Sequence, residues 1–425
     1  MSEESNGQPA AAAVEAGSSS SSGRRRRPRR RRSKRGSATA VPAKGAPAAA
    51  SETSVTGFLW RREDGRTVLV PVSQGLRPSP GDPVVDPGVI SRWHLEAGLQ
   101  VTGLVQAGGG RNRASVTRIS GIEGLDPEEY RSKALPFADL ISIDPTDRFS
   151  LETEPDILEP RVIELMAPIG KGQRCLIVAP PKAGKTTLLQ QLSHAIGVNH
   201  PEVQIFVLLV DERPEEVTDW RRSVVRGEVV ASSSDESIQS HIEVSEMVLE
   251  RARRLVELGQ HVVVLMDSLT RMSRAYNNAQ RGSGRIMSGG IDARTMEKPR
   301  RFFGSARNIE GGGSLTIIAT CLVDTGSRMD EVIFQEFKGT GNMEIVLSHD
   351  LFERRIFPCV NIPQSGTRKE EKLYSREDVE KIYLLRRALA SLPPHEAMQL
   401  LLSRLKQART NAEFLAGVQV PAAGK

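Results

Sequence analysis

The chain has 425 residues, of which 38% are hydrophobic and 26% are charged, and its formal net charge is +6. This length is enough for two or three domains with hydrophobic cores. No apolar run approaches the ~18 residues of a membrane span, and no apolar segment near the N-terminus resembles a secretory signal. We therefore expect a cytoplasmic protein with no membrane partner.

Residues 1–50 hold all of the excess positive charge. They contain 11 Lys and Arg against 3 acidic residues, whereas the remainder of the chain has 47 basic and 49 acidic residues. Ala, Ser, Gly and Pro surround the run RRRRPRRRRSKR at 24–35, so there is little apolar surface to bury and a disordered arm is predicted. Such an arm is either a solubilising tail or a contact to the phosphates of a nucleic acid, and the dense arginine favours the second.

Residues 51–120 have the pattern of a small all-β domain. Short apolar runs alternate with turn residues, namely GFLW at 57–60, TVLVPV at 67–72, LQVTGLV at 99–105 and ASVTRI at 114–119. We predict a barrel of about five strands, with no segment long and periodic enough for a good helix. Phe58 and Trp60 either stack on bases or form part of the core, and the residues alone leave both interpretations open.

Residues 121–150 form a connector, and the pattern from 151 to 425 is α/β. Apolar runs such as CLIVA (175–179), IFVLLV (205–210), VVVLM (262–266) and LTIIAT (315–320) alternate with helical stretches. Continuous apolar runs between helices predict a parallel sheet that is covered on both faces. The three cysteines, Cys175, Cys321 and Cys359, are far apart and are expected to be buried thiols.

A phosphate-binding loop follows the first of these strands. CLIVA leads into APPKAGKTTLLQQL, in which Ala179 stands where the usual pattern has its first glycine. The strand–loop–helix context still predicts nucleotide binding, because backbone N–H groups and a helix N-terminus would point at the phosphates. Lys185 would bridge the β- and γ-phosphates and Thr186 would hold Mg²⁺. The expected ATP-binding residues of the loop are Lys182, Ala183, Gly184, Lys185, Thr186 and Thr187.

Acidic side chains follow two further strands. Asp211, Glu212 and Arg213 end the second strand, at the edge where ligands bind in open α/β sheets. We expect Glu212 to polarise the attacking water, although the stretch could also be the solvated start of a helix. Asp267 follows five apolar residues and is expected to position the metal, while Arg271 would sense phosphate or pair with an acid.

Two glycine-bearing loops are the expected nucleic-acid contacts of this domain. They are RGSGRIMSGG at 281–290 and DTGSRMD at 324–330, and a ring of such loops would line a channel and hold a backbone. Further along, SGTRKEE at 365–371 contains Arg368, which could stabilise transition-state charge across a subunit interface.

Several of these runs together resemble one bacterial family. GQRCLIVAPPKAGKT, VLLVDERPEEVTDW, MDSLTRMSRAYN, DTGSRMDEVIFQEFKGTGNME and SGTRKEE are similar to the transcription termination factor Rho family, over roughly 55 to 425. The resemblance implies an OB-fold (cold-shock-like) domain followed by a RecA-like P-loop ATPase domain. It implies a homohexamer that uses ATP and Mg²⁺, binds single-stranded nascent RNA, moves 5′ to 3′ and acts on the RNA polymerase elongation complex.

The resemblance also assigns roles to residues. Glu212 corresponds to the catalytic glutamate, with Arg213 beside it, and Arg368 to the arginine finger. Arg355 corresponds to a second interface arginine and Phe357 to the aromatic residue that packs on adenine. Arg285 and Arg328 correspond to RNA contacts in the central channel, and GFLW, with Phe58 and Trp60, to the first RNA-facing strand.

Two other classes of protein remain open from the residues. A nucleotide-binding subunit of a rotary ATPase-like hexamer also pairs a barrel with such a core, but gives no reason for the arginine arm. A pure RNA-binding scaffold would leave Lys185, Glu212 and Asp267 without a role.

Overall fold

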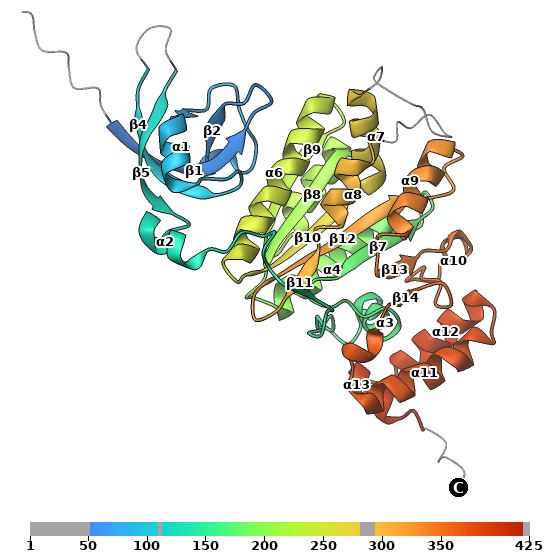
Figure 1. The fold of residues 1–425 in the computed structure, drawn as a ribbon. Coiled ribbons are helices and arrows are strands. Elements are labelled where there is room, and N and C mark those ends of the chain that lie inside the picture. The colour runs from blue at the N-terminus through green and yellow to red at the C-terminus, as the bar shows by residue number, and fades with distance from the viewer. Residues whose placement is uncertain (1–51, 109–112, 281–293, 420–425) are drawn as a thin grey trace, which may run out of the picture. The chain divides into compact units, whose positions relative to one another are not determined.

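The computed structural model describes residues 52–108, 113–280 and 294–419 (Figure 1). The arginine arm and the loop at 281–290, with Arg285, therefore lie outside the described residues. In the described ranges, no helix is both long and apolar enough to cross a membrane.

The first part of the described chain is a closed five-stranded barrel. Its strands are β1 Glu52–Arg61, β2 Thr67–Pro71, β3 Val84–Val85, β4 Gln100–Gln106 and β5 Ser115–Ile122. They follow the order β1-β2-β3-β5-β4 around the barrel, with β3 and β5 parallel and the other pairs antiparallel. Alternate residues point inward, and Leu59, Leu69, Val101 and Val116 belong to the buried interior.

The barrel contains a helix, contrary to the expectation from the sequence. Helix α1, Pro87–Trp93, lies between β3 and β4. Asp86 caps it by accepting a hydrogen bond from the Gly88 N–H, and Pro87 occupies its first turn. Asp86 and Pro87 thus supply the start signal of the helix.

The second part is a nine-stranded sheet whose central strands are parallel. The order of the main path is β14-β13-β7-β12-β10-β8-β9, and β11 and β6 extend it antiparallel beside β12. The strands are β6 Ser142–Ile143, β7 Arg174–Ala179, β8 Gln204–Glu212, β9 Glu228–Ser233, β10 His261–Asp267, β11 Arg307–Ile309, β12 Ser314–Leu322, β13 Met343–Val346 and β14 Gly366–Thr367. The predicted α/β class is confirmed.

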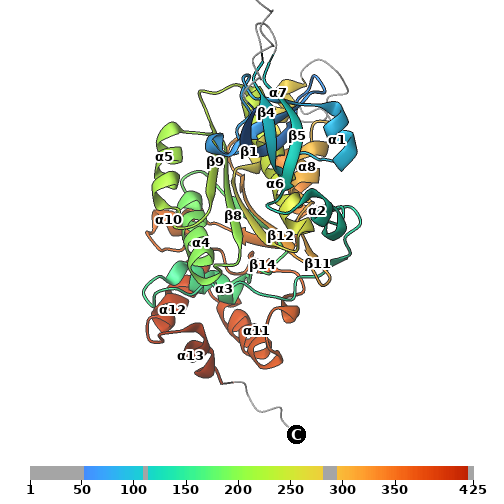
Figure 2. The same ribbon diagram turned by 90° about the vertical axis from the view of Figure 1, so that its left-hand side faces the viewer.

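Helices cover both faces of this sheet (Figures 1 and 2). Helix α2 Pro127–Lys133 of the connector lies beside β5 of the barrel. The helices of the second part are α3 Leu158–Met166, α4 Lys185–Asn199, α5 Pro214–Ser223, α6 Ile238–Glu257, α7 Leu269–Ala279, α8 Glu297–Phe303, α9 Arg328–Lys338, α10 His349–Glu353, α11 Arg376–Ala390, α12 Pro394–Leu405 and α13 Asn411–Ala416.

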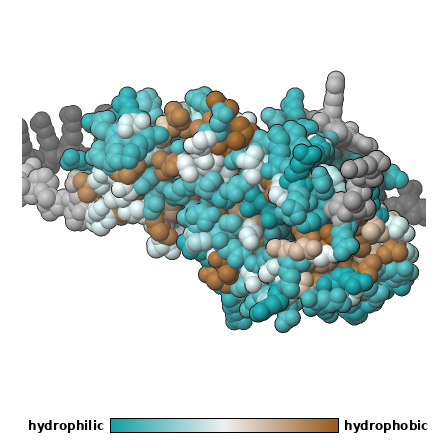
Figure 3. All heavy atoms as spheres, turned by 90° about the horizontal axis from the view of Figure 1, so that it is seen from below, coloured by the Kyte–Doolittle hydropathy of each residue, from teal (hydrophilic) through white to brown (hydrophobic). Residues whose placement is uncertain are grey.

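Each face of the sheet packs into its own hydrophobic cluster. One contains Ile177 and Val207 with α3, α4 and the C-terminal helices α11 to α13, and the other contains Val178 and Leu208 with α6 to α9. Seen from below, hydrophilic side chains predominate on the surface and hydrophobic ones form separate patches (Figure 3). The cysteines are buried, as expected, with Cys175 and Cys321 fully enclosed and Cys359 3% exposed.

The outer face of the barrel packs against α6. Phe58 and Trp60 project from β1 into the cluster of α6 to α9, and the Arg251 guanidinium lies over the Phe58 ring and pairs with Glu123 at 2.5 Å. Gly98 has φ +84°, and a Cβ there would lie 2.4 Å from the Glu250 carbonyl carbon. Only glycine therefore allows the turn before β4 to approach the helix backbone so closely.

Candidate active site

The phosphate loop joins β7 to α4 at the carboxyl edge of the sheet. Ala179 is fully buried as the last residue of β7 and pairs with Leu322 of β12. Its position therefore requires no glycine. The turn is made later, by Lys182 at φ +65° and Gly184 at φ +83°. A Cβ on Gly184 would meet no atom within 4 Å, so φ and not space calls for glycine there.

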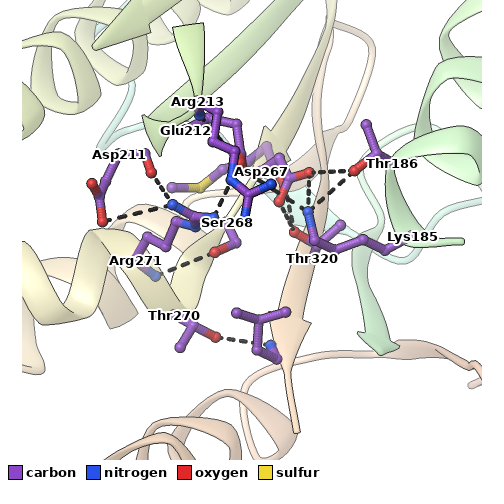
Figure 4. Close-up of polar contacts among 12 residues, drawn as sticks. Lys185, Thr186, Asp211, Glu212, Arg213, Asp267, Ser268, Thr270, Arg271 and Thr320 are labelled. Carbon is purple, nitrogen blue, oxygen red and sulfur yellow. Dashed lines mark hydrogen bonds and ion pairs between the residues drawn. The ribbon is translucent and has the colours of Figure 1, made fainter. Parts of the chain in front are cut away.

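Lys185 and Thr186 begin α4 and point at a buried carboxylate (Figure 4). The Lys185 Nζ lies 2.6 Å from Asp267 Oδ2, and the Thr186 hydroxyl lies 3.3 Å from the same oxygen. The other oxygen, Asp267 Oδ1, accepts a 2.8 Å hydrogen bond from Thr320. Asp267 is fully buried at the end of β10, so the three partners fix the direction of its carboxylate.

Glu212, at the end of β8, is the second buried carboxylate of the site. It is 1% exposed, and its Oε1 accepts a 3.0 Å hydrogen bond from Arg271. Arg271 also donates to the Asp211 carbonyl (Figure 4). The Glu212 Oε2 has no hydrogen-bond partner among the described residues, although Lys185 Nζ is 3.9 Å away. One oxygen is thus held in place and the other is free to accept a proton.

The surroundings of Glu212 favour its protonated form. Burial is the main cause, the charge of Asp267 adds to it, and Lys185 and Arg271 oppose them, which leaves the pKa of Glu212 raised to about 7. A carboxylate with a pKa near neutrality can take a proton from water at physiological pH.

The other residues of the two predicted motifs lie at the rim. Lys182 and Thr187 are exposed on the loop and first turn of α4, and Ala183 is buried beneath them. Arg213 is exposed as the residue that precedes α5, and its side chain has no ion-pair partner among the described residues. Arg213 is therefore beside the site but does not contact Glu212 through its side chain.

An apolar hollow of about 390 Å³ adjoins the loop. Its lining includes Gly184, Thr187, Phe352, Phe357 and Cys359. Phe357 is 43% exposed, and its ring meets Phe352 edge to face at 6.0 Å between centroids. A half-exposed ring in an apolar hollow beside a phosphate loop suits a flat, aromatic base. Arg355 is exposed beside it, with its guanidinium 5.3 Å from the Phe352 ring.

Arg368 does not belong to this cluster. It directly follows β14, and its N–H donates to the Asn342 carbonyl. Its charge, together with the dominant effect of burial, lowers the pKa of Arg174. Because Arg174 begins β7 while the phosphate loop follows the end of β7, roughly 17 Å of strand separates the two.

Two of the candidate RNA contacts are not free in this structure. Phe58 and Trp60 are 7% and 5% exposed. This placement corresponds to the core interpretation and leaves no open ring face for a base, because the alternation of β1 turns both rings toward α6. Arg328 is exposed at the start of α9, with no side-chain partner in the described part of the chain.

The role of Thr320 in the site was not predicted from the sequence, and that of Arg271 was predicted only in part. Thr320 fixes the Asp267 carboxylate, and its signal is a hydroxyl residue within the apolar run LTIIAT. Arg271 was expected to sense phosphate or to pair with an acid, and in the structure it pairs with Glu212. Spacing could not choose between these, because the choice depends on how β8 and α7 lie together.

Comparisons with known proteins identify a nucleotide-binding domain in the second part of the chain. Residues 160–367 match the model of the ATP synthase alpha/beta family, nucleotide-binding domain. The chain is 48% identical over 367 residues to "Transcription termination factor Rho" of Cereibacter sphaeroides, an alignment that covers 85% of this chain and 86% of that one.

It is also 50% identical over 355 residues to the protein of the same name from Micrococcus luteus, with 81% of this chain covered. The chain spans only about half of that relative, since the aligned part is 51% of its length. Among solved structures, a type III secretion system ATPase superposes with a TM-score of 0.55 at 21% identity, over 66% of this chain and 86% of that one. That likeness concerns the fold alone.

Proposed function

The chain belongs to the transcription termination factor Rho family, and from that premise we propose that it is an RNA-dependent ATPase that moves 5′ to 3′ along nascent transcripts and ends transcription. The observation that supports this best is the cluster of Lys185, Thr186, Glu212 and Asp267 at one edge of the sheet. A phosphate loop, a metal-orienting carboxylate and a base for water are the parts that phosphoryl transfer to water needs.

ATP would lie across the start of α4. Lys185 and the backbone N–H groups of the loop hold the phosphates, and Phe357 packs against the adenine. The Thr186 hydroxyl and the Asp267 carboxylate are hard oxygen donors directed at one point, which suits Mg²⁺, and these two residues would hold it. Bound there, the metal would neutralise charge on the phosphates.

Hydrolysis begins when a water attacks the γ-phosphorus and ADP leaves. Glu212 Oε2 accepts the proton of that water, while Arg271 keeps Oε1 in place. Lys185 stays on the phosphates. Arg368 of a neighbouring subunit supplies positive charge to the transferring group, because its own chain holds it at the wrong end of β7.

We propose a homohexamer with four segments in each chain. They are the arm at 1–50, an OB-fold RNA-binding domain at 51–120, the connector at 121–150 and a RecA-like ATPase domain at 151–425. The closed barrel with a helix between β3 and β4 supports the OB-fold assignment. Arg328, together with Arg285, would contact single-stranded RNA in the central channel, and the RNA polymerase elongation complex in the cytoplasm would be the target.

Hydrolysis with and without RNA tests the proposed function. We expect slow ATP turnover by the protein alone and a large increase when unstructured single-stranded RNA is added, because the channel contacts complete the active ring. Phosphate release with Mg²⁺ and ATP measures it. A rate that RNA leaves unchanged would contradict this function and favour a rotary ATPase-like subunit.

The pH profile tests the role of Arg271. A general base is active when deprotonated, so activity is lost as the pH falls through its pKa. Removing the positive charge in Arg271→Ala should let the pKa of Glu212 rise further, and the acidic limb of kcat/KM should move to higher pH. Arg271→Lys, which keeps the charge, is the matched control. An acidic limb that stays at the wild-type pH in Arg271→Ala would show that this pairing does not tune the base.

A further inference from the structure

Two adjoining hollows lie between the barrel and the outer side of α6 and α8. One has a volume of about 620 Å³ and is lined by Phe137, Arg253, Arg301 and Arg307, among others. The second, of about 320 Å³, is lined by residues that include Trp60, Arg61, Tyr276 and Lys298. Glu250, Arg253 and Arg301 line both, so the two hollows form one continuous groove, called here the α6–α8 groove.

The α6–α8 groove has more cations than its carboxylates can pair. Lys298 pairs with Glu246, Arg253 with Glu250 and Arg254 with Glu96. Three further guanidiniums, those of Arg61, Arg301 and Arg307, have no carboxylate within ion-pair distance among the described residues. The charge of Arg301 interacts with that of Glu250, but the two side chains do not form an ion pair. An uncompensated group of guanidiniums attracts anions, and phosphates in particular.

Arg307 shows the same excess from within the groove. Burial, and after it the positive charges of Arg253 and Arg174, lower its pKa, and no carboxylate of the described residues opposes them. Its guanidinium lies 4.5 Å from the centre of the Phe137 ring, and that of Arg253 lies 5.5 Å from the same ring. The Phe137 ring thus holds these two guanidiniums by cation–π contacts, in a place where a carboxylate would be the more usual partner.

The position of the groove suggests its ligand. Arg61 ends β1 of the barrel. Tyr276 is in α7 and Lys298 is in α8, the two helices that flank the segment 281–293. The groove therefore runs from the barrel to the C-terminal end of α7 and the start of α8. In the sequence, the predicted channel contact Arg285 lies between these two helices. The aromatic residues of the groove, Trp60, Phe137 and Tyr276, are buried and offer no ring face for stacking, so the cations would hold the strand through its phosphates.

We propose that the α6–α8 groove binds the phosphate backbone of single-stranded RNA between the barrel and the helices α7 and α8, with Arg61, Arg301 and Arg307 as the phosphate contacts. The inference rests on the proposed function, in that it takes RNA as the ligand of the protein. Contacts to the backbone should add affinity without base preference.

The salt dependence of RNA binding tests the groove in the full-length protein. Arg61 and Arg301 are exposed and form no ion pair with the described residues, so the double variant Arg61→Ala/Arg301→Ala should fold normally. Each phosphate that the protein no longer neutralises on a single strand makes the slope of log K against log salt shallower by about 0.7. We therefore expect a slope shallower by about 1.4 for fluorescently labelled, unstructured RNA. The double variant Arg222→Ala/Arg376→Ala removes two exposed arginines outside the groove and should keep the wild-type slope.

Cross-linking locates the contact in the unmodified protein. RNA that carries 4-thiouridine should give cross-linked peptides that contain Arg61 or Arg301. Absence of both peptides, or a wild-type slope in the groove variant, would overturn the proposal. The proposal would also be overturned if the groove variant bound RNA more weakly because its oligomeric state, measured by sedimentation, had changed. The groove would then be a subunit interface. Failure of the proposed function has a different signature, namely a wild-type ATPase that ignores RNA.

Discussion

Glu212→Gln should bind ATP as tightly as the wild-type protein and lose about 10²- to 10⁴-fold in turnover. The amide has the shape of the carboxyl group and can still accept the Arg271 hydrogen bond through its oxygen. It cannot take a proton from water, so only the step that needs a base is affected. Nucleotide binding by fluorescence and single-turnover hydrolysis with saturating RNA measure the two effects separately.

Glu215→Gln is the matched control for this change. Glu215 is exposed in the first turn of α5, three residues from Glu212, and forms no hydrogen bond or ion pair with the buried cluster. Both its turnover and its ATP affinity should equal those of the wild type. Turnover at the wild-type rate in Glu212→Gln would mean that another group activates the water.

Arg368→Ala should lower hydrolysis by about 10³-fold or more, as removal of an arginine finger does in other phosphoryl-transfer enzymes. The side chain is exposed and makes no ion pair within its own described chain, so its removal should not destabilise the fold. If Arg368 serves the site of a neighbouring subunit, as proposed, the activity of mixed rings should fall by more than the share of variant subunits. Hydrolysis measured over a series of mixtures with wild-type subunits gives the dependence.

Arg376→Ala is a suitable control, since Arg376 is also exposed and forms only a surface pair with Glu380. Mixtures with this variant should keep full activity at every ratio. If Arg368→Ala instead reduced activity in strict proportion to its share of subunits, the arginine would act within its own chain or have no catalytic part.

The parts of the site that follow directly from strands could be predicted from the sequence. Lys185, Glu212 and Asp267 each follow a continuous apolar run, and such runs are strands of a parallel sheet whose carboxyl ends share one edge. Chain order and hydrophobicity were therefore sufficient to predict that these three residues lie close together. The direction of each carboxylate was not, because Thr320 and Arg271 reach it from other elements.

The role of β1 shows where a single sequence is insufficient. Alternation shows that Phe58 and Trp60 share one face of the strand and Leu59 the other. It does not show whether that outer face meets solvent, RNA or another domain. Here α6 covers it, and the Gly98 turn allows the close approach. That packing is a tertiary property, and no local pattern in GFLW contains it.

The three buried cysteines have a practical consequence for measuring motion in this protein. Burial raises the pKa of Cys321 to about 12 and that of Cys359 to about 11, and raises that of Cys175 as well, so their reactive thiolate forms are scarce at neutral pH. A cysteine introduced at an exposed position such as Arg376 of α11 should then react with maleimide dyes far faster than the native thiols. Pairs of fluorescent or spin labels can thus be attached to two introduced cysteines without first removing any native one. With one label on the barrel and the other on α11, the distance between the two can be measured during ATP turnover.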